Sequence, residues 1–326
     1  MIFSKKEEEM LLEIFKIYAP SRKEEPMIEY IENFLKENSI PYTKDDNGNI
    51  FNLSYENTPL LSAHMDSVGD SNDGYINDFV NIFDYRSDRI LRGMGNIGGD
   101  DKCGIFIILR KLLINKKINF IFSIGEEVGC IGINQVIPKN DIKSIPYGLV
   151  IDRRGFGDII CLQNSYGNKE FEDALSEVGK DFGFVPAHGL CSDANAISKY
   201  INCANLSSGY HNPHGKKEFV SLVQLRNTAD YIDEVFKKFA DKKFENPKPV
   251  EEKKYNSSKA YNDDFYSDYD YKYGKGKGAQ YDFYKDKFYC PICKAYVENK
   301  HKVILSKKTD LICDACAKRI REQIPS

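Results

Sequence analysis

The sequence predicts an α/β fold built around a mixed, mostly parallel sheet that helices cover on both faces. Short, continuous runs of Ile, Leu, Val and Phe alternate with stretches of helical periodicity through residues 1–244. Such uninterrupted apolar runs are typical of strands buried on both faces, which parallel sheets contain. Acidic and imidazole side chains directly follow several of these runs, as expected at the carboxyl edge of such a sheet.

Within residues 1–244, the apolar pattern predicts strands and helices in alternation. Helices are expected where apolar residues recur every three or four positions, at 5–17, 26–38, 103–113, 131–136, 168–180, 192–199 and 221–240. Strands are expected at the continuous apolar runs 50–54, 59–63, 118–124, 148–151 and 202–206. The helix at 103–113 illustrates the helical pattern, with Ile105, Ile108 and Leu112 on one side.

Composition divides the 326 residues into three segments: a large domain (1–244), a linker (245–287) and a small C-terminal domain (288–326). The linker holds nine acidic and nine basic residues and almost no aliphatic side chains, so we expect it to be disordered. The net charge of −3 comprises −7 on the large domain and +4 on the C-terminal domain. A strongly basic nucleic-acid-binding protein is therefore excluded on overall charge.

The sequence shows no sign of membrane insertion or secretion. No apolar run reaches the roughly 18–20 residues that a membrane span needs, and MIFSKKEEEM at the start lacks the apolar core of a signal peptide. A cytoplasmic protein without membrane contact is therefore expected. In that compartment, its nine cysteines are more often metal ligands or small buried side chains than disulfide partners.

His, Asp and Glu residues gather where the predicted strands and one glycine-rich turn end. They are His64 and Asp66, Asp100 and Asp101, Glu126 and Glu127, Asp152, and His211 and His214. Because the carboxyl ends of parallel strands meet at one edge of a sheet, these clusters should converge in space. Burying so many carboxylates together without a cation would raise their pKa values at a large cost in free energy. The sequence therefore predicts a metal centre at this edge.

Charge balance favours two divalent ions in this centre. We consider two divalent ions bound by His64, Asp100, Glu127, Asp152 and His214. The three carboxylates of this set and one bridging hydroxide would balance the four positive charges of two ions. Imidazole and carboxylate are the ligands of zinc sites that keep a position open for water. Two Zn²⁺, or two other divalent ions, are therefore the expected cofactors.

Some of these residues have simpler interpretations. Glu126 and Glu127 alone would suit the start of a solvated helix, and His64 alone would suit a buried core histidine. His211 competes with His214 for the last ligand position. His188 fits a loop near the site better than a ligand position.

A glycine motif precedes Asp100. Gly93–Gly98 matches the G-x-G-x-x-G pattern of dinucleotide-binding folds, but it runs into an Asp–Asp pair that would repel phosphate. We expect these glycines instead to let the backbone bend and present Asp100.

Taken together, the motifs resemble those of the co-catalytic zinc exopeptidases. The motifs are H-M-D at 64–66, D-D-K-C-G at 100–104, G-E-E-V-G at 125–129, I-D at 151–152 and P-H-G-K-K-E-F at 213–219, in that family's order. The sequence is most similar to peptidase T and its relatives, and more distantly to carboxypeptidase G and the succinyl-diaminopimelate desuccinylases. The resemblance extends over residues 1–240 and implies the fold of that family.

The resemblance also implies which residue binds which ion. Asp100 would bridge both metal ions. Glu127 and His214 would complete one site, and His64 and Asp152 would complete the other. The implied reaction is hydrolysis of an amide bond by a hydroxide that bridges the two zinc ions.

Two further roles follow from the resemblance. Asp66 would orient the imidazole of His64 without binding a metal ion itself, and Glu126 would act as the general base. The peptide bond between Asp100 and Asp101 would be cis, as it often is in this family.

The chain is shorter than peptidase T between its motifs. Only 61 residues separate Asp152 from His214, and 35 separate His64 from Asp100, too few for the inserted lid domain. We therefore expect a bare catalytic domain, closer in layout to the single-domain aminopeptidases.

The lid of the relatives contributes groups that hold the substrate's carboxylate, so this chain needs substitutes. Arg153 and Arg154 are candidates, because a guanidinium can bind a carboxylate through two hydrogen bonds. His211 is a further candidate for contact with substrate.

The last segment predicts a zinc ribbon. Its two C-x-x-C pairs, Cys290 with Cys293 and Cys313 with Cys316, would hold one structural Zn²⁺ in a closed tetrahedral site. A redox pair is the alternative. The basic residues of this ribbon could contact nucleic acid or an acidic protein surface, although a solvated face is the simpler interpretation. The other five cysteines, Cys103, Cys130, Cys161, Cys191 and Cys203, are expected to be small buried side chains.

The sequence therefore predicts a metallo-exopeptidase acting on short peptides, as an aminopeptidase or a tripeptidase. An N-acyl amino acid amidohydrolase or a carboxypeptidase could use the same site. A binding protein that retains the fold without activity, with the ribbon as its contact surface, is the alternative of another class.

Overall fold

The computed structural model describes residues 2–69, 80–93, 95–240 and 242–246, together with the backbone of four strands between residues 288 and 313. By its internal contacts the chain divides into two compact units, residues 1–249 and 250–326. Within the part of the chain that is described, no helix combines the length and apolar character needed to cross a membrane.

An eight-stranded sheet forms the centre of the first unit. In spatial order its strands are β1 (Thr43–Lys44), β2 (Ile50–Asn52), β6 (Asn119–Ser123), β3 (Leu60–His64), β7 (Gly148–Arg153), β10 (Cys203–Ser207), β8 (Asp158–Ile160) and β9 (Val185–Pro186). The four central strands β6, β3, β7 and β10 run parallel. Antiparallel pairs join β2 to β6 and β8 to β10. The predicted mixed, mostly parallel sheet is confirmed.

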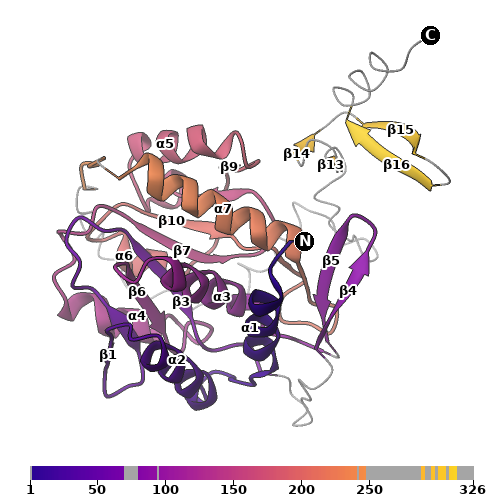
Figure 1. Ribbon diagram of the computed structural model, residues 1–326. Coiled ribbons are helices and arrows are strands. Elements are labelled where there is room, and N and C mark those ends of the chain that lie inside the picture. Colours follow the sequence, from indigo (N-terminus) through magenta and orange to yellow (C-terminus); the bar gives the residue numbers. More distant parts are fainter. Residues whose placement is uncertain are drawn as a thin grey trace, which may run out of the picture. The chain divides into compact units, whose positions relative to one another are not determined.

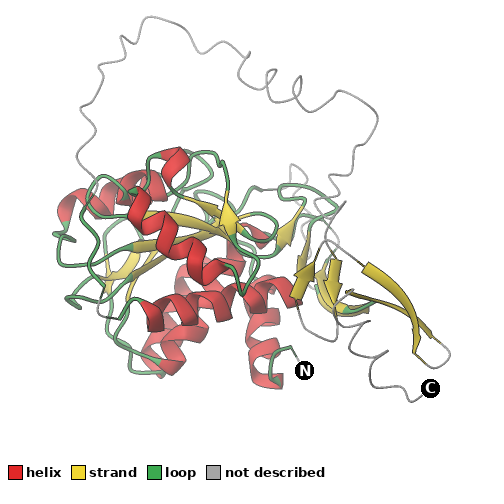
Figure 2. Cartoon of the chain, turned by 90° about the horizontal axis from the view of Figure 1, so that it is seen from above, coloured by secondary structure: helices red, strands yellow, loops and turns green. Residues whose placement is uncertain are grey.

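Helices cover both faces of this sheet (Figures 1 and 2). One apolar layer contains residues of α1 (Lys5–Lys16), α2 (Glu25–Glu37), α3 (Gly99–Ile114), α5 (Lys169–Gly179) and α7 (Leu222–Lys238). The opposite layer contains residues of α4 (Ile131–Val136) and α6 (Ala194–Ile197). Strand β6 contributes side chains to both layers, because Phe120 and Phe122 pack in the first and Ile121 packs in the second. The unit also contains two short 3₁₀ helices among its described residues, η2 (Ile137–Lys139) and η3 (Leu162–Asn164).

Side-chain caps fix where three helices begin. Ser4 and Glu7 form a reciprocal capping box at α1. Asn168 accepts a hydrogen bond from the Phe171 N–H at α5, and Ser221 accepts one from the Gln224 N–H at α7. These caps explain why the helices predicted at 5–17, 168–180 and 221–240 begin within one residue of their expected starts.

A second sheet of four antiparallel strands was not predicted. Its order is β11 (Tyr210–His211), β12 (Phe219–Ser221), β5 (Asp88–Arg92) and β4 (Asn81–Tyr85). The outer strand β4 is largely exposed, so its sequence has no continuous apolar run to indicate a buried strand. This sheet matters for the site, because the chain between β11 and β12 contains His214.

The second unit contains two hairpins. Strand β13 (Phe288–Cys290) pairs with β14 (Ala295–Val297), and β15 (Lys300–Leu305) pairs with β16 (Lys308–Cys313). Cys290 and Cys313 are the last residues of β13 and β16. Cys293 and Cys316, and residues 247–287 of the predicted linker, lie outside the described residues.

Candidate metal centre

Parallel strands bring the predicted ligands to one edge of the large sheet. His64 ends β3 and is the register partner of Ser123, the last residue of β6. Glu126 and Glu127 follow β6 after a short turn, and Asp152 lies near the end of the adjacent β7. Because β3, β6 and β7 are parallel neighbours, their carboxyl ends place these side chains together.

Asp100 lies between the two histidines. Its Oδ1 is 3.0 Å from Nε2 of His64, and its Oδ2 is 3.2 Å from Nε2 of His214. Each imidazole has a second carboxylate beside it: Asp152 Oδ1 lies 3.6 Å from His64 Nε2, and Glu127 Oε1 lies 2.9 Å from His214 Nε2. The five predicted ligands thus form one continuous row with Asp100 at its centre.

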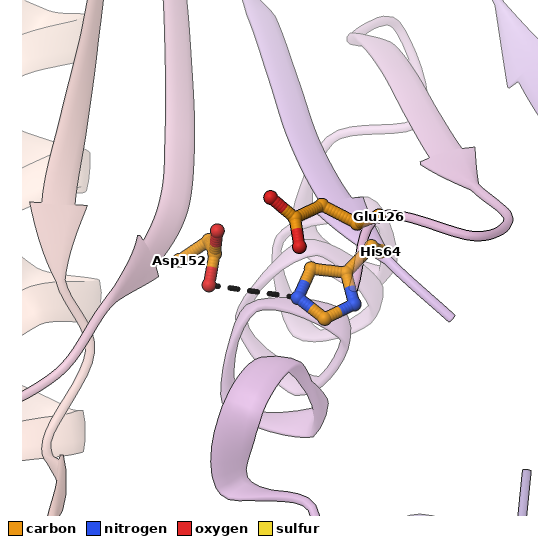
Figure 3. A group of neighbouring side chains, drawn as sticks. All are labelled: His64, Glu126 and Asp152. Carbon is orange, nitrogen blue, oxygen red and sulfur yellow. Dashed lines mark ion pairs between the residues drawn. The ribbon is translucent and has the colours of Figure 1, made fainter. Parts of the chain in front are cut away.

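Glu126 lies beside this row. Donor atoms of His64, Glu126 and Asp152 all lie within 4.8 Å of one another, and so do those of His64, Asp100 and Glu127. Figure 3 shows the first of these groups, with the Glu126 carboxylate near the His64 ring and Asp152. Glu126 therefore lies next to the His–Asp100–His row without being part of it.

Burial and neighbouring groups shift the pKa values of several side chains in the site. The pKa of Asp100 is lowered, because hydrogen bonds from His214 and His64 outweigh its burial. A hydrogen bond with Asp100 and the nearby carboxylate of Glu127 raise the pKa of His214 to about 10. Burial and neighbouring carboxylates raise the pKa of Glu126 to about 8 and that of Asp152 well above its usual range. Without a cation, this arrangement depends on protonated imidazoles to offset the carboxylate charges.

The side chains present fit divalent ions. Glu127 Oε1 is buried and makes no hydrogen bond, although His214 Nε2 lies only 2.9 Å away. A buried carboxylate oxygen without a hydrogen-bond partner calls for another partner, and a metal ion would be one. Imidazole and carboxylate together are the donor set that zinc accepts at catalytic sites.

Asp66 connects His64 to the turn that contains the glutamates. Its backbone carbonyl lies 2.9 Å from His64 Nδ1, and its carboxylate lies 3.3 Å from the same atom. The carboxylate also accepts hydrogen bonds from the backbone N–H groups of Glu126 and Glu127 and from the hydroxyl of Ser21. Asp66 therefore fixes both the imidazole and the backbone of the 126–127 turn, a wider role than the predicted orientation of His64 alone.

The glycine-rich turn positions Asp100 through Glu218, a residue that sequence reasoning did not single out. The fully buried carboxylate of Glu218 accepts hydrogen bonds of 2.7–2.9 Å from the backbone N–H groups of Ile97, Gly98 and Gly99. Gly98 has a φ of 67°, a conformation that favours glycine, and helix α3 begins directly after it. The only sequence signal was the position of Glu218 within the P-H-G-K-K-E-F motif.

Helix α3 starts at Gly99 rather than at residue 103, and its first turn is irregular. Asp100 and Asp101 have non-helical backbone angles, and the peptide bond between them is cis, as the resemblance implied. Asp101 turns away from the row and accepts hydrogen bonds from the backbone N–H groups of His64 and Gly104. A Cβ at position 104 would lie 2.6 Å from this carboxylate, so the motif requires glycine there.

Replacing Glu218 with Gln is expected to weaken metal retention and to lower the free energy of unfolding by about 1–3 kcal/mol, because a neutral amide cannot accept three backbone N–H groups. Urea unfolding and metal content after dialysis would measure the two effects. Glu177→Gln, on the exposed side of α5, is the matched control. Unchanged metal retention in Glu218→Gln would contradict a positioning role.

The candidate substrate-binding residues lie in different surroundings. Arg153 pairs with Asp158 at 3.0 Å and donates to the backbone carbonyl of His188, so its guanidinium already has protein partners. Arg154 is exposed. His211 hydrogen-bonds Gln224 at 2.7 Å and stacks on Phe219, and it belongs to no potential metal-ligand group among the described residues.

One of the cysteine predictions is wrong. Cys103, Cys130, Cys161 and Cys203 are buried, but Cys191 is exposed. It lies in the irregular segment before α6, where the backbone runs over the surface.

Similarity to known proteins lies in the fold. No protein-family model matches the chain, and no curated protein sequence matches it. The structure of the aminopeptidase PepT from Bacillus cereus ATCC 10987 matches with a TM-score of 0.58 and 15% identity, covering 74% of this chain and 100% of that chain. A tripeptidase from Staphylococcus aureus subsp. aureus Mu50 has a TM-score of 0.60 and 14% identity, with coverage of 74% and 100%.

A third structure, the Pyrococcus horikoshii TET1 peptidase, has a TM-score of 0.54 and 15% identity and covers 70% of this chain and 98% of that chain. That peptidase can assemble into a tetrahedron or a large octahedral shell. Because the sequence identities are this low, the similarity establishes the fold alone. The chain has the α/β fold of these peptidases.

Proposed function

We propose that this chain is a metal-dependent exopeptidase that hydrolyses amide bonds of short peptides. The proposal rests on Asp100, whose two carboxylate oxygens lie 3.0 and 3.2 Å from the imidazoles of His64 and His214. A carboxylate between two imidazoles, each with a carboxylate partner of its own, suits two neighbouring divalent ions. The fold shared with aminopeptidase and tripeptidase structures agrees with this function.

The ligands would divide between the two ions. Asp100 would bind both, His64 and Asp152 would complete one site, and Glu127 and His214 would complete the other. Zinc or another divalent ion bound there supplies a Lewis acid for the scissile carbonyl and lowers the pKa of a water.

Glu126 would move the proton. Its carboxylate lies beside the row of candidate ligands, where it could take a proton from water and pass it to the leaving amine. The turn that contains Glu126 is held by Asp66, so the carboxylate keeps its place beside His64 and Asp152.

A panel of substrates would test the function. Peptides with a free amine, N-blocked peptides and N-acyl amino acids would be assayed with and without a chelator. Chelator-sensitive cleavage of free-amine di- and tripeptides is expected for an aminopeptidase or a tripeptidase. Cleavage of N-blocked substrates instead would favour a carboxypeptidase or a deacylase, and no metal-dependent hydrolysis of any substrate would contradict the proposal.

We also propose that the catalytic unit works without a lid domain. The 61 residues between Asp152 and His214 form β8, η3, α5, β9, α6, β10 and β11, most of which belong to the central α/β unit. Groups that recognise the ends of the substrate would then come from this unit itself.

Replacing Arg154 with Ala is expected to raise KM for peptides with a free carboxylate while leaving kcat nearly unchanged, because an exposed guanidinium would contribute to substrate binding alone. The increase should be small for amidated peptides, which offer no carboxylate. Arg92→Ala, at an exposed position of β5, is the control. Equal KM values for the wild type and Arg154→Ala would remove Arg154 from the site.

For the C-terminal unit we propose a structural zinc ribbon, with Cys290, Cys293, Cys313 and Cys316 as ligands. A segment as short as residues 288–326 usually needs a metal or another cross-link to fold. Chelation is expected to unfold this unit before the catalytic unit. Hydrogen exchange of β13–β16 and of the large sheet, measured at increasing chelator, would test this order, and protected hairpins in metal-free protein would contradict it.

A further inference from the structure

A further group of three potential metal ligands contains Glu126 and two residues outside the ligand row. Donor atoms of Glu126, Cys130 and Asp193 all lie within 4.8 Å of one another, and Cys130 Sγ is 3.5 Å from Glu126 Oε1. The turn after β6 explains the first contact. The backbone N–H groups of Gly129 and Cys130 both donate to the carbonyl of Glu126, which folds Cys130 back toward the glutamate.

Asp193 has one buried oxygen without a hydrogen-bond partner. The residue is 1% exposed, and its Oδ2 accepts a hydrogen bond from the hydroxyl of Ser123. Its Oδ1 is buried and has no hydrogen-bond partner. A buried carboxylate oxygen without a partner costs free energy that a bound cation would recover. The proposed peptidase mechanism gives this residue no task.

We propose that Glu126, Cys130 and Asp193 form a third metal site, which binds a thiophilic divalent ion and thereby inhibits the enzyme. One thiolate and two carboxylates suit Zn²⁺, Co²⁺ or Cd²⁺, whereas Mg²⁺, Ca²⁺ and Mn²⁺ prefer oxygen ligands alone. Two carboxylates and one thiolate carry three negative charges, which a divalent ion largely offsets.

Cys191 lies at the exposed side of this site. Its sulfur lies within reach of Cys130. Since Cys191 is exposed, it offers an incoming ion a sulfur atom to contact before the buried donors.

Occupancy of this site would stop proton transfer. An ion bound to the Glu126 carboxylate occupies the oxygen that must accept the proton from water, so the enzyme would lose its base while its two catalytic ions stay in place. Excess metal would thus act as an inhibitor. This consequence rests on the proposed function, whereas the existence of the site does not.

Cobalt spectroscopy tests the site without turnover. Co²⁺ bound to a thiolate gives an intense near-ultraviolet charge-transfer band, which carboxylate and imidazole ligands do not give. The full-length, zinc-loaded protein would be titrated with Co²⁺ under a non-thiol reductant, which prevents a disulfide between Cys130 and Cys191. Any band from the C-terminal cysteines is common to all variants compared.

The expected result is a weaker thiolate band in Cys130→Ala and in Cys130→Ser than in the wild type. Cys161→Ala, which removes a buried cysteine outside every potential ligand group of the described residues, should match the wild type. Equal bands in all of these proteins would overturn the site. Cys130→Ser keeps the side-chain size and provides a second test if the alanine variant does not fold.

Inhibition tests the consequence. The concentration of excess Zn²⁺ that halves each protein's own basal turnover should rise by about tenfold or more in the Cys130 variants. A lost band with unchanged zinc inhibition would refute the inhibitory role. A chain without peptidase activity under any condition would refute the proposed function, and the cobalt band would still decide whether the site exists.

Discussion

Replacing Glu126 with Gln is expected to lower kcat for peptide hydrolysis by about 10²–10⁴-fold, the usual contribution of a general base, while the catalytic metal content stays unchanged. Glutamine keeps the size of the side chain but cannot accept a proton at neutral pH. The turn at 126–127 is held by backbone N–H groups that donate to Asp66, and the substitution does not alter them.

Steady-state kinetics and metal analysis of the same preparation would check this prediction. Glu29→Gln, an exposed substitution on α2, serves as the control and should retain full activity and metal. Wild-type turnover in Glu126→Gln would exclude Glu126 as the base. Loss of metal together with activity would show instead that Glu126 is a ligand.

Replacing Asp100 with Asn should have a different outcome, in which the site loses both ions. The two oxygens of Asp100 face different histidines, and an asparagine offers one oxygen and one amide nitrogen in their place. Replacing a residue that only hydrogen-bonds a metal ligand typically lowers metal affinity by about 10–100-fold. Replacing Asp100, the shared ligand itself, should lower the affinity by more than that. Turnover at limiting metal would fall in parallel.

Titration of metal-free protein with Zn²⁺ would measure this effect. Asp46→Asn, at an exposed turn position, is the control and should bind metal like the wild type. Loss of one ion with normal binding of the other would contradict the shared role of Asp100.

The sequence was sufficient for the central sheet and for the row of ligands because both leave local patterns. Continuous apolar runs predicted the strands that became β2, β3, β6, β7 and β10, and the charged residues that interrupt these runs predicted the edge where they meet. His64, for example, follows Leu60–Ala63 directly, so its place at the end of β3 could be derived from its neighbours alone.

Other parts of the site depend on partners far away in the chain. Glu218 accepts hydrogen bonds from Ile97, Gly98 and Gly99, about 120 positions away, and no local pattern indicates such a contact. Asp193 approaches Glu126 only because α6 packs under the sheet beside β7 and β10. The exposed strand β4 was missed for a different reason, since its residues lack the apolar character by which buried strands are found.

The hydrogen bonds of Asp66 and Glu218 have a consequence for how the protein matures. Asp66 holds His64 and the 126–127 turn, and Glu218 holds the segment before Asp100, through contacts within the polypeptide alone. On the proposed function, the candidate ligands would be in place before any ion arrives. Folding of the large unit would then not depend on metal, and ions could be acquired, exchanged or lost after folding. A cell could thus store the protein unloaded and activate it by metal supply.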